Sequence, residues 1–91
     1  MVKTKDVASF LEGKGFEVVY MSGSYKAYLN KQLTVLFEGK PNHTAKLLVL
    51  SGQSEALEKA IDMLKSFFED NKAKPIVEKS FSSANMGVLY L

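Results

Sequence analysis

The side chains that could perform acid–base, nucleophilic or metal chemistry are few and scattered in this sequence of 91 residues. His43 is the single histidine and cysteine is absent, which excludes a histidine-based metal cluster and thiol catalysis. His43 lies in a Pro-Asn-His-Thr run that is typical of a solvated turn. The serines lack the Gly-x-Ser-x-Gly pattern of a nucleophile elbow. The sequence therefore predicts no catalytic residue, no metal site and no cofactor, and it indicates a protein that is not an enzyme.

Two further groupings of polar residues are explained by local structure. Glu55, Glu58 and Asp62 have helical spacing, and a solvated helix face accounts for them without a metal ion. The turn Ser51–Ser54 joins an expected strand to an expected helix, where free backbone N–H groups can hold an anion. Every strand-to-helix turn offers such groups, so we interpret this stretch as scaffold.

Two amphipathic helices are expected to support the rest of the chain. The first covers Thr4–Lys14, with Thr4 as its N-cap. The second begins at Ser54, which is expected to cap it, and ends near Asn71, because Pro75 disfavours helix at the residue before it. The apolar stripe that should face a sheet consists of Leu57, Ala60, Ile61, Leu64, Phe67 and Phe68.

Six segments are expected to be strands. They are Phe16–Met21, Tyr25–Leu29, Leu33–Glu38, Ala45–Leu50, Ile76–Phe81 and Met86–Leu91, with a turn over residues 82–85. The segment Tyr25–Leu29 fits neither the helical nor the strand period, and we assign it as strand. The nearly continuous apolar run of Ala45–Leu50 indicates a central strand. The apolar C-terminal segment should either pair inside the sheet or meet another copy of the chain.

The order of these elements, α-β-β-β-β-α-β-β, predicts one α+β domain over residues 1–91. Its expected architecture is a two-layer sandwich, with a largely antiparallel sheet and both helices packed on one face. The sequence shows neither a signal peptide nor an apolar run long enough to span a bilayer. We therefore expect a cytoplasmic protein that does not associate with membranes.

The charge distribution suggests where a partner would bind. The net charge is +2, and all twelve cationic side chains are lysine. Residues 22–50 carry four lysines and one acid, whereas residues 51–70 carry two lysines and five acids. The absence of arginine argues against base-specific reading of DNA, but lysine can still contact phosphates.

The lysines of the basic segment are interleaved with tyrosines, as in a platform for nucleic acid. If the helices cover one face of the sheet, the other face and its loops should carry Tyr20 and Tyr25 together with the candidate nucleic-acid-binding residues Lys26, Tyr28, Lys31, Lys40 and Lys46. Lysine and tyrosine are also ordinary residents of a solvated antiparallel sheet face.

Two segments, Leu33–Lys40 and Leu47–Glu55 with the helix that follows, resemble one half-repeat of the TATA-box-binding-protein fold. The resemblance covers residues 16–71. This chain has one such repeat, inserts a loop at residues 41–46, and has no positions that match the family's phenylalanine wedges and arginines. The resemblance implies a curved sheet with helices behind it and minor-groove binding through that sheet.

The sequence thus favours a binding module that contacts DNA or RNA without sequence specificity. The competing hypothesis is a protein-interaction domain, which would form a homodimer through the C-terminal strand or the exposed sheet face. Affinity for nucleic acid should fall steeply with added salt, whereas an apolar interface should be nearly indifferent to it.

Overall fold

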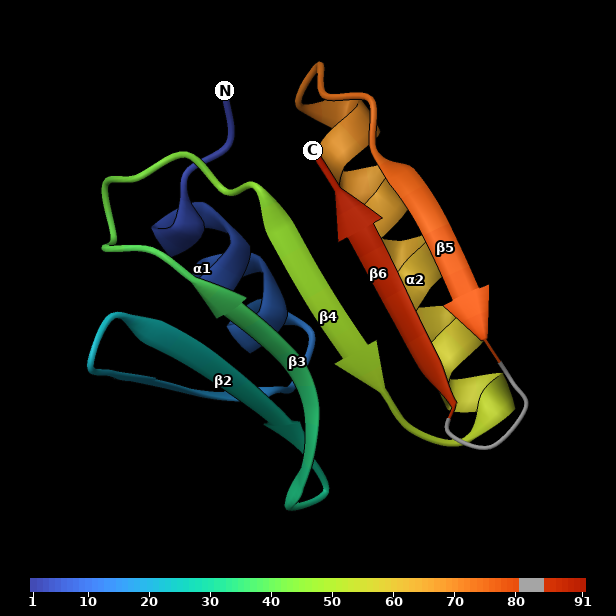
Figure 1. Ribbon diagram of the computed structural model, residues 1–91. Coiled ribbons are helices and arrows are strands. Elements are labelled where there is room, and N and C mark those ends of the chain that lie inside the picture. The colour runs from blue at the N-terminus through green and yellow to red at the C-terminus, as the bar shows by residue number, and fades with distance from the viewer. Residues whose placement is uncertain (81–84) are drawn as a thin grey trace.

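The computed structural model describes residues 1–80 and 85–91, which form one sheet and two helices (Figure 1). The elements are α1 (Thr4–Gly13), β1 (Glu17–Met21), β2 (Ser24–Leu29), β3 (Gln32–Glu38), β4 (Leu47–Ser51), α2 (Ser54–Asp70), β5 (Ile76–Ser80) and β6 (Met86–Tyr90). Their order is the predicted one, so the α+β fold class is confirmed.

The six strands form a single sheet in the order β1-β2-β3-β4-β6-β5, and every neighbouring pair is antiparallel. β4 is central, as its continuous apolar run predicted. β6 lies between β4 and β5, so the C-terminal strand pairs inside the sheet and has no free edge. The edges of the sheet are β1 and β5.

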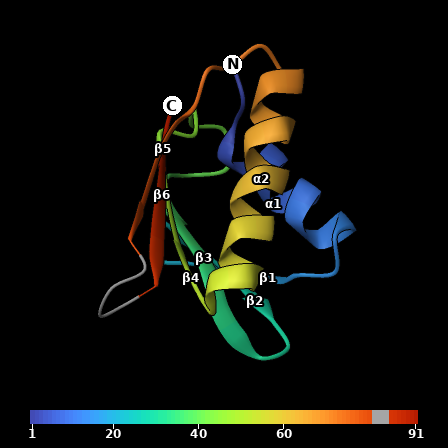
Figure 2. The same ribbon diagram turned by 90° about the vertical axis from the view of Figure 1, so that its right-hand side faces the viewer.

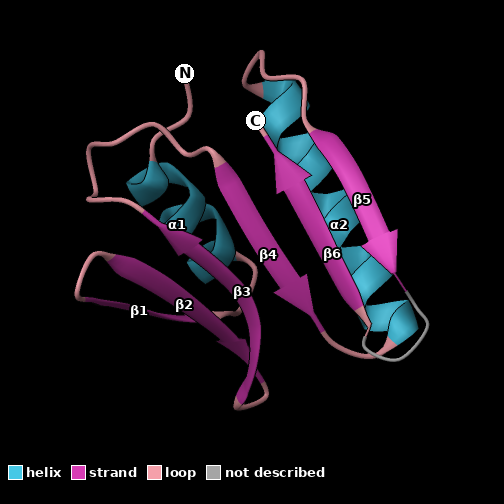
Figure 3. Ribbon diagram, in the orientation of Figure 1, coloured by secondary structure: helices cyan, strands magenta, loops and turns pink. Residues whose placement is uncertain are grey.

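The domain has two layers, because both helices lie on the same face of the sheet (Figure 2). In Figure 3, which is turned by 90° from Figure 2, the strands lie in front of α1 and α2. The core between the layers is made of alternate strand residues and one stripe of each helix. Its fully enclosed members include Val7, Leu11, Ala27, Val35, Leu48, Leu50, Leu57, Leu64, Phe68 and Leu89.

The predicted stripe of α2 is buried against the sheet at every position except Phe67. The Phe67 ring instead stacks on Phe10 of α1, with ring centroids 4.2 Å apart, and so joins the two helices. α2 also approaches β6 closely at Gly87, where an added Cβ would lie 2.5 Å from Cδ1 of Ile61. Glycine at this position therefore sets the distance between helix and sheet.

Both predicted helix caps are wrong by one residue. The N-caps are Lys3 and Gln53, and Thr4 and Ser54 are the first helical residues. Thr4 is fully buried, and its hydroxyl donates a hydrogen bond to the Lys40 carbonyl at 2.6 Å instead of capping its own helix. Asp6 completes the first turn of α1, since its carboxylate accepts a hydrogen bond from the Lys3 backbone N–H.

Most strand limits agree with the predicted ones to within a residue. The uncertain segment Tyr25–Leu29 is confirmed as strand. β4 begins two residues later than expected, because the Ala45 N–H bonds to the Val2 carbonyl and not to a neighbouring strand. β5 ends at Ser80. The predicted strand residue Phe81 and residues 82–84 of the predicted turn lie outside the described residues.

Candidate functional site

The sheet face opposite the helices, here called the open face, is the candidate functional surface. Strand register defines its side chains, because residues paired across antiparallel strands point to the same side. One row across the sheet consists of Val19, Lys26, Leu36, Val49, Val88 and Glu78. A second row on the same face joins Leu47, Tyr90 and Ile76.

The centre of the open face is apolar. Leu36, Val49 and Val88 lie side by side in the first row. Beside them, Leu47 is 42% exposed, Tyr90 41% and Ile76 64%. An antiparallel sheet with helices on one face normally presents polar side chains on the other. A contiguous apolar patch on that face is typical of an interaction surface.

Charged side chains flank this apolar centre. Lys26 of β2 follows Val19 near one end of the first row, and Glu78 of β5 stands at the other end. Glu38 ends β3 and shares the face with Leu36, since the two are separated by two positions along the strand. Lys79, next to Glu78, points to the opposite side, where its ammonium group lies 3.2 Å from the Glu58 carboxylate of α2.

The five predicted nucleic-acid-binding residues are not gathered in one place. Lys26 and Tyr28 lie on the open face, on β2. Lys31 lies in the turn between β2 and β3. Lys40 lies in the β3–β4 loop, and Lys46 directly precedes β4. The Lys31 turn and the pair Lys40 and Lys46 are therefore at opposite ends of β3.

The expected position of Tyr25 on the open face is wrong. Tyr25 is only 5% exposed, and its ring stacks on Phe37 in the core at a centroid distance of 4.8 Å. Tyr20 points to the same side, because it pairs with Tyr25 and their ring centroids are 4.6 Å apart. Side chains alternate along a strand, so Tyr25 and Tyr28, three positions apart, fall on opposite faces.

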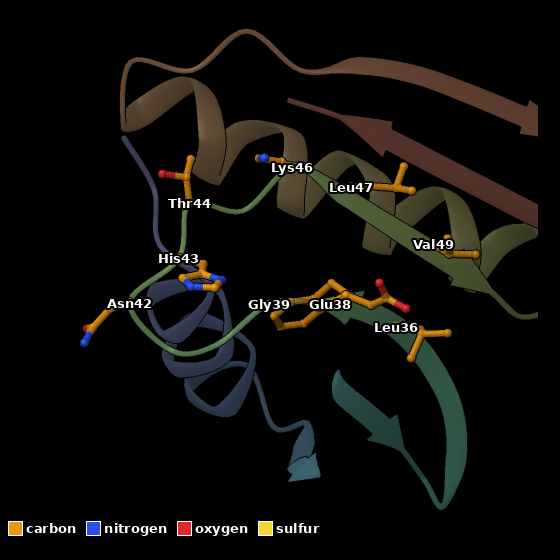
Figure 4. Close-up of a pocket in the computed structure, with 10 residues that line it drawn as sticks. Leu36, Glu38, Gly39, Asn42, His43, Thr44, Lys46, Leu47 and Val49 are labelled. Atoms are coloured by element: carbon orange, nitrogen blue, oxygen red, sulfur yellow. The ribbon is translucent and has the colours of Figure 1, made fainter. Parts of the chain in front are cut away.

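A hollow of about 870 Å³ lies where the open face meets the β3–β4 loop (Figure 4). Its floor includes Leu36, Leu47 and Val49 from the apolar centre, and Glu38 extends over the same strands. The loop contributes His43 to the wall. The hollow therefore enlarges the apolar surface at one end and adds polar groups to its border.

The β3–β4 loop is held in place by the N-terminus of α1. The Thr4 N–H donates to the His43 carbonyl at 2.9 Å, and the Lys5 N–H donates to the Pro41 carbonyl at 3.1 Å. His43 Nδ1 accepts a bond from the Lys40 N–H at 3.3 Å, which leaves Nε2 to carry the proton of the neutral ring. Exposed loop residues are thus fixed in position by backbone bonds.

The described residues contain no group of three or more His, Cys, Asp or Glu side chains arranged to hold a metal ion. In residues 1–80 and 85–91, neither helix has the length and apolar character needed to cross a bilayer.

Sequence reasoning missed most of the apolar residues of the open face. The available signal was the lack of alternation in Leu47–Leu50 and in Val88–Tyr90. Continuous apolar runs are typical of strands that are covered on both faces. The run in β4 predicts a central position, and it also places apolar side chains on the face of the strand that points away from the helices.

Comparisons of the chain with protein-family models, with curated proteins and with solved structures found no match. The resemblance to a TATA-box-binding-protein half-repeat therefore stays a prediction.

Proposed function

We propose that this protein is a non-enzymatic interaction domain that binds another protein through its open face. One observation carries the proposal: β3, β4 and β6 bear apolar side chains on both faces, whereas α1 and α2 cover only one. Burial of apolar surface contributes about 25 cal/mol per Å². A protein partner that covers the row Leu36, Val49 and Val88 would remove this surface from water.

Nucleic-acid binding is the competing proposal, and its support is the basic segment of the chain. A phosphate backbone would meet Lys26 on the open face, but it would also meet Glu38 and Glu78 there. These carboxylates repel phosphates, and the apolar side chains between them offer no hydrogen bonds. The composition of the open face therefore favours a protein partner over a nucleic acid.

Site-specific photo-crosslinking in the protein's native cells tests the proposal. A benzophenone amino acid is placed at Val49, in the centre of the open face, and in a control variant at Asp62, on the exposed side of α2. We expect ultraviolet light to give discrete adducts from position 49. These adducts should be removed by protease and left intact by nuclease, because the partner is a protein. Position 62 should give few adducts.

Two outcomes would contradict the proposal. Nuclease-sensitive adducts at position 49 would identify nucleic acid as the occupant of the open face. Equal labelling at positions 49 and 62 would mean that the open face is not a preferred contact surface.

A further inference from the structure

We propose that the open face binds a second copy of this chain, related by a two-fold axis that runs along β4 between the two facing sheets. This inference rests on the proposed function and specifies its partner. When such an axis relates two packed sheets, a strand on one side of β4 in one copy faces the strand at the same distance on the other side of β4 in the second copy. With the axis on β4, the side chains of the first row on one side of β4 complement those on its other side in the second copy.

The first row shows this complementarity. From β2 to β5 its five members are Lys26, Leu36, Val49, Val88 and Glu78, so Val49 is central among these five and the outer two have opposite charge, whereas Val19 of β1 lies beyond the overlap of the two copies. Rotation about β4 places Val49 over the partner's Val49 and Leu36 over the partner's Val88. The same rotation brings Lys26 to the partner's Glu78, and the pair occurs twice because of the symmetry.

The second row fits the same axis. Leu47 of β4 lies on the axis and packs on the partner's Leu47. Glu38 of β3 then faces the partner's Tyr90 of β6, because β3 and β6 flank β4 on either side. The Tyr90 hydroxyl can donate a hydrogen bond to the Glu38 carboxylate. Every charged group named on the open face thus meets an oppositely charged or hydrogen-bonding group.

The size of the surface predicts a dimer of modest affinity. The axis on β4 brings five strands of each copy, β2 to β5, over one another; at about 4.8 Å between strands and about 3.4 Å per residue over five residues, this gives a face of about 410 Å². Two such faces bury about 800 Å², which is below the standard size of specific protein interfaces and in the range of weak, transient ones. The dimer should therefore dissociate on dilution, and the charged pairs should have a measurable effect on its dissociation constant.

Charge reversal with sedimentation equilibrium tests the pairing. Lys26→Glu and Glu78→Lys are each expected to raise the dimer dissociation constant about tenfold, since each reversal creates two like-charge contacts per dimer. The double variant restores opposite charges and should return the constant to within about threefold of the wild-type value. Lys65→Glu, on the exposed side of α2, is the matched control and should have no effect.

The outcomes separate this inference from the proposed function. If both single reversals weaken the dimer but the double variant does not recover, the pairing of Lys26 with the partner's Glu78 is wrong. If Val49→Lys abolishes association but neither charge reversal changes it, the axis along β4 is wrong, although the open face is still the interface. A wild-type protein that stays monomeric at millimolar concentration overturns the second copy as partner. Protease-sensitive adducts at position 49 that join a different protein would then still support the proposed function.

Discussion

At the scale of single residues, Thr4 connects the N-terminus of the chain to the loop beside the open face. It is the one polar residue that is fully buried among those described, and its hydroxyl bonds to the Lys40 carbonyl. Gly39 lies against it with φ of +123°, and a Cβ there would be 3.1 Å from the Thr4 methyl carbon. The loop can adopt this conformation because glycine tolerates the positive φ.

Thr4→Val should lower the free energy of unfolding by about 1 kcal/mol, because it removes a buried hydrogen bond without changing the volume of the side chain. The loss is at the low end of the range, since the Lys40 carbonyl still accepts a bond from the His43 N–H. Urea unfolding measures the change. Thr34→Val, which removes a bond to the exposed Gln32 carbonyl, is the control and should change stability by less than about 0.5 kcal/mol. Equal losses in the two variants would contradict this role for Thr4.

Residue types show where the lysines and tyrosines stand along the chain, but not which side chains share a surface. Tyr25 and Tyr28 were expected together, and strand alternation separates them. Lys31 and Lys40 belong to the same basic segment of the sequence and lie at opposite ends of β3. Closeness in sequence was mistaken for closeness on the surface.

At the scale of elements, the helices and strands were predictable because their apolar periods are regular. The stripe of α2 and the limits of β3 follow directly from the 3.6-residue and two-residue repeats. The N-cap of α1 was not predictable from residue preference, because Thr4, a good capping residue, is used in a tertiary contact. Phe67 was expected on the sheet and packs between the helices instead, which no single-helix pattern could indicate.

The packing of α2 on β6 gives a prediction about Gly87. Gly87→Ala should destabilise the domain by about 1–3 kcal/mol, because the new methyl group overlaps Cδ1 of Ile61. Ile61→Val removes that carbon and should itself cost about 0.5–1.5 kcal/mol. Thermal or urea unfolding of both single variants and the double variant forms a double-mutant cycle.

The double variant is expected to be more stable than the sum of the two losses implies. Gly13→Ala is the control, since an added Cβ at Gly13 has no neighbour within 4 Å and alanine favours helix. It should leave stability unchanged or raise it by up to about 1 kcal/mol. Strict additivity at positions 61 and 87 would show that α2 and β6 are not in tight contact at this point.

At the scale of the whole molecule, the sequence allowed the two-layer architecture to be predicted but not the use of its outer face. The strand order could not be derived, because the chain passes from β4 through α2 to the edge strand β5, and β6 then inserts between β4 and β5. That insertion brings Val88 and Tyr90 beside Val49 and Leu47, and so makes the open face continuous. Two apolar runs that are far apart in sequence thereby become one surface.

The most direct test of the central claim, that the open face associates through apolar contact, is the molar mass in solution by light scattering. The wild-type protein is measured over a range of concentrations, in low and high salt, with and without a mixed oligonucleotide pool. We predict a mass that rises from monomer to dimer with concentration, does not depend on oligonucleotides, and falls only slightly in high salt, where the two pairs of Lys26 with the partner's Glu78 are screened. A monomer whose mass rises only when oligonucleotides are added, and falls again in high salt, would contradict the claim.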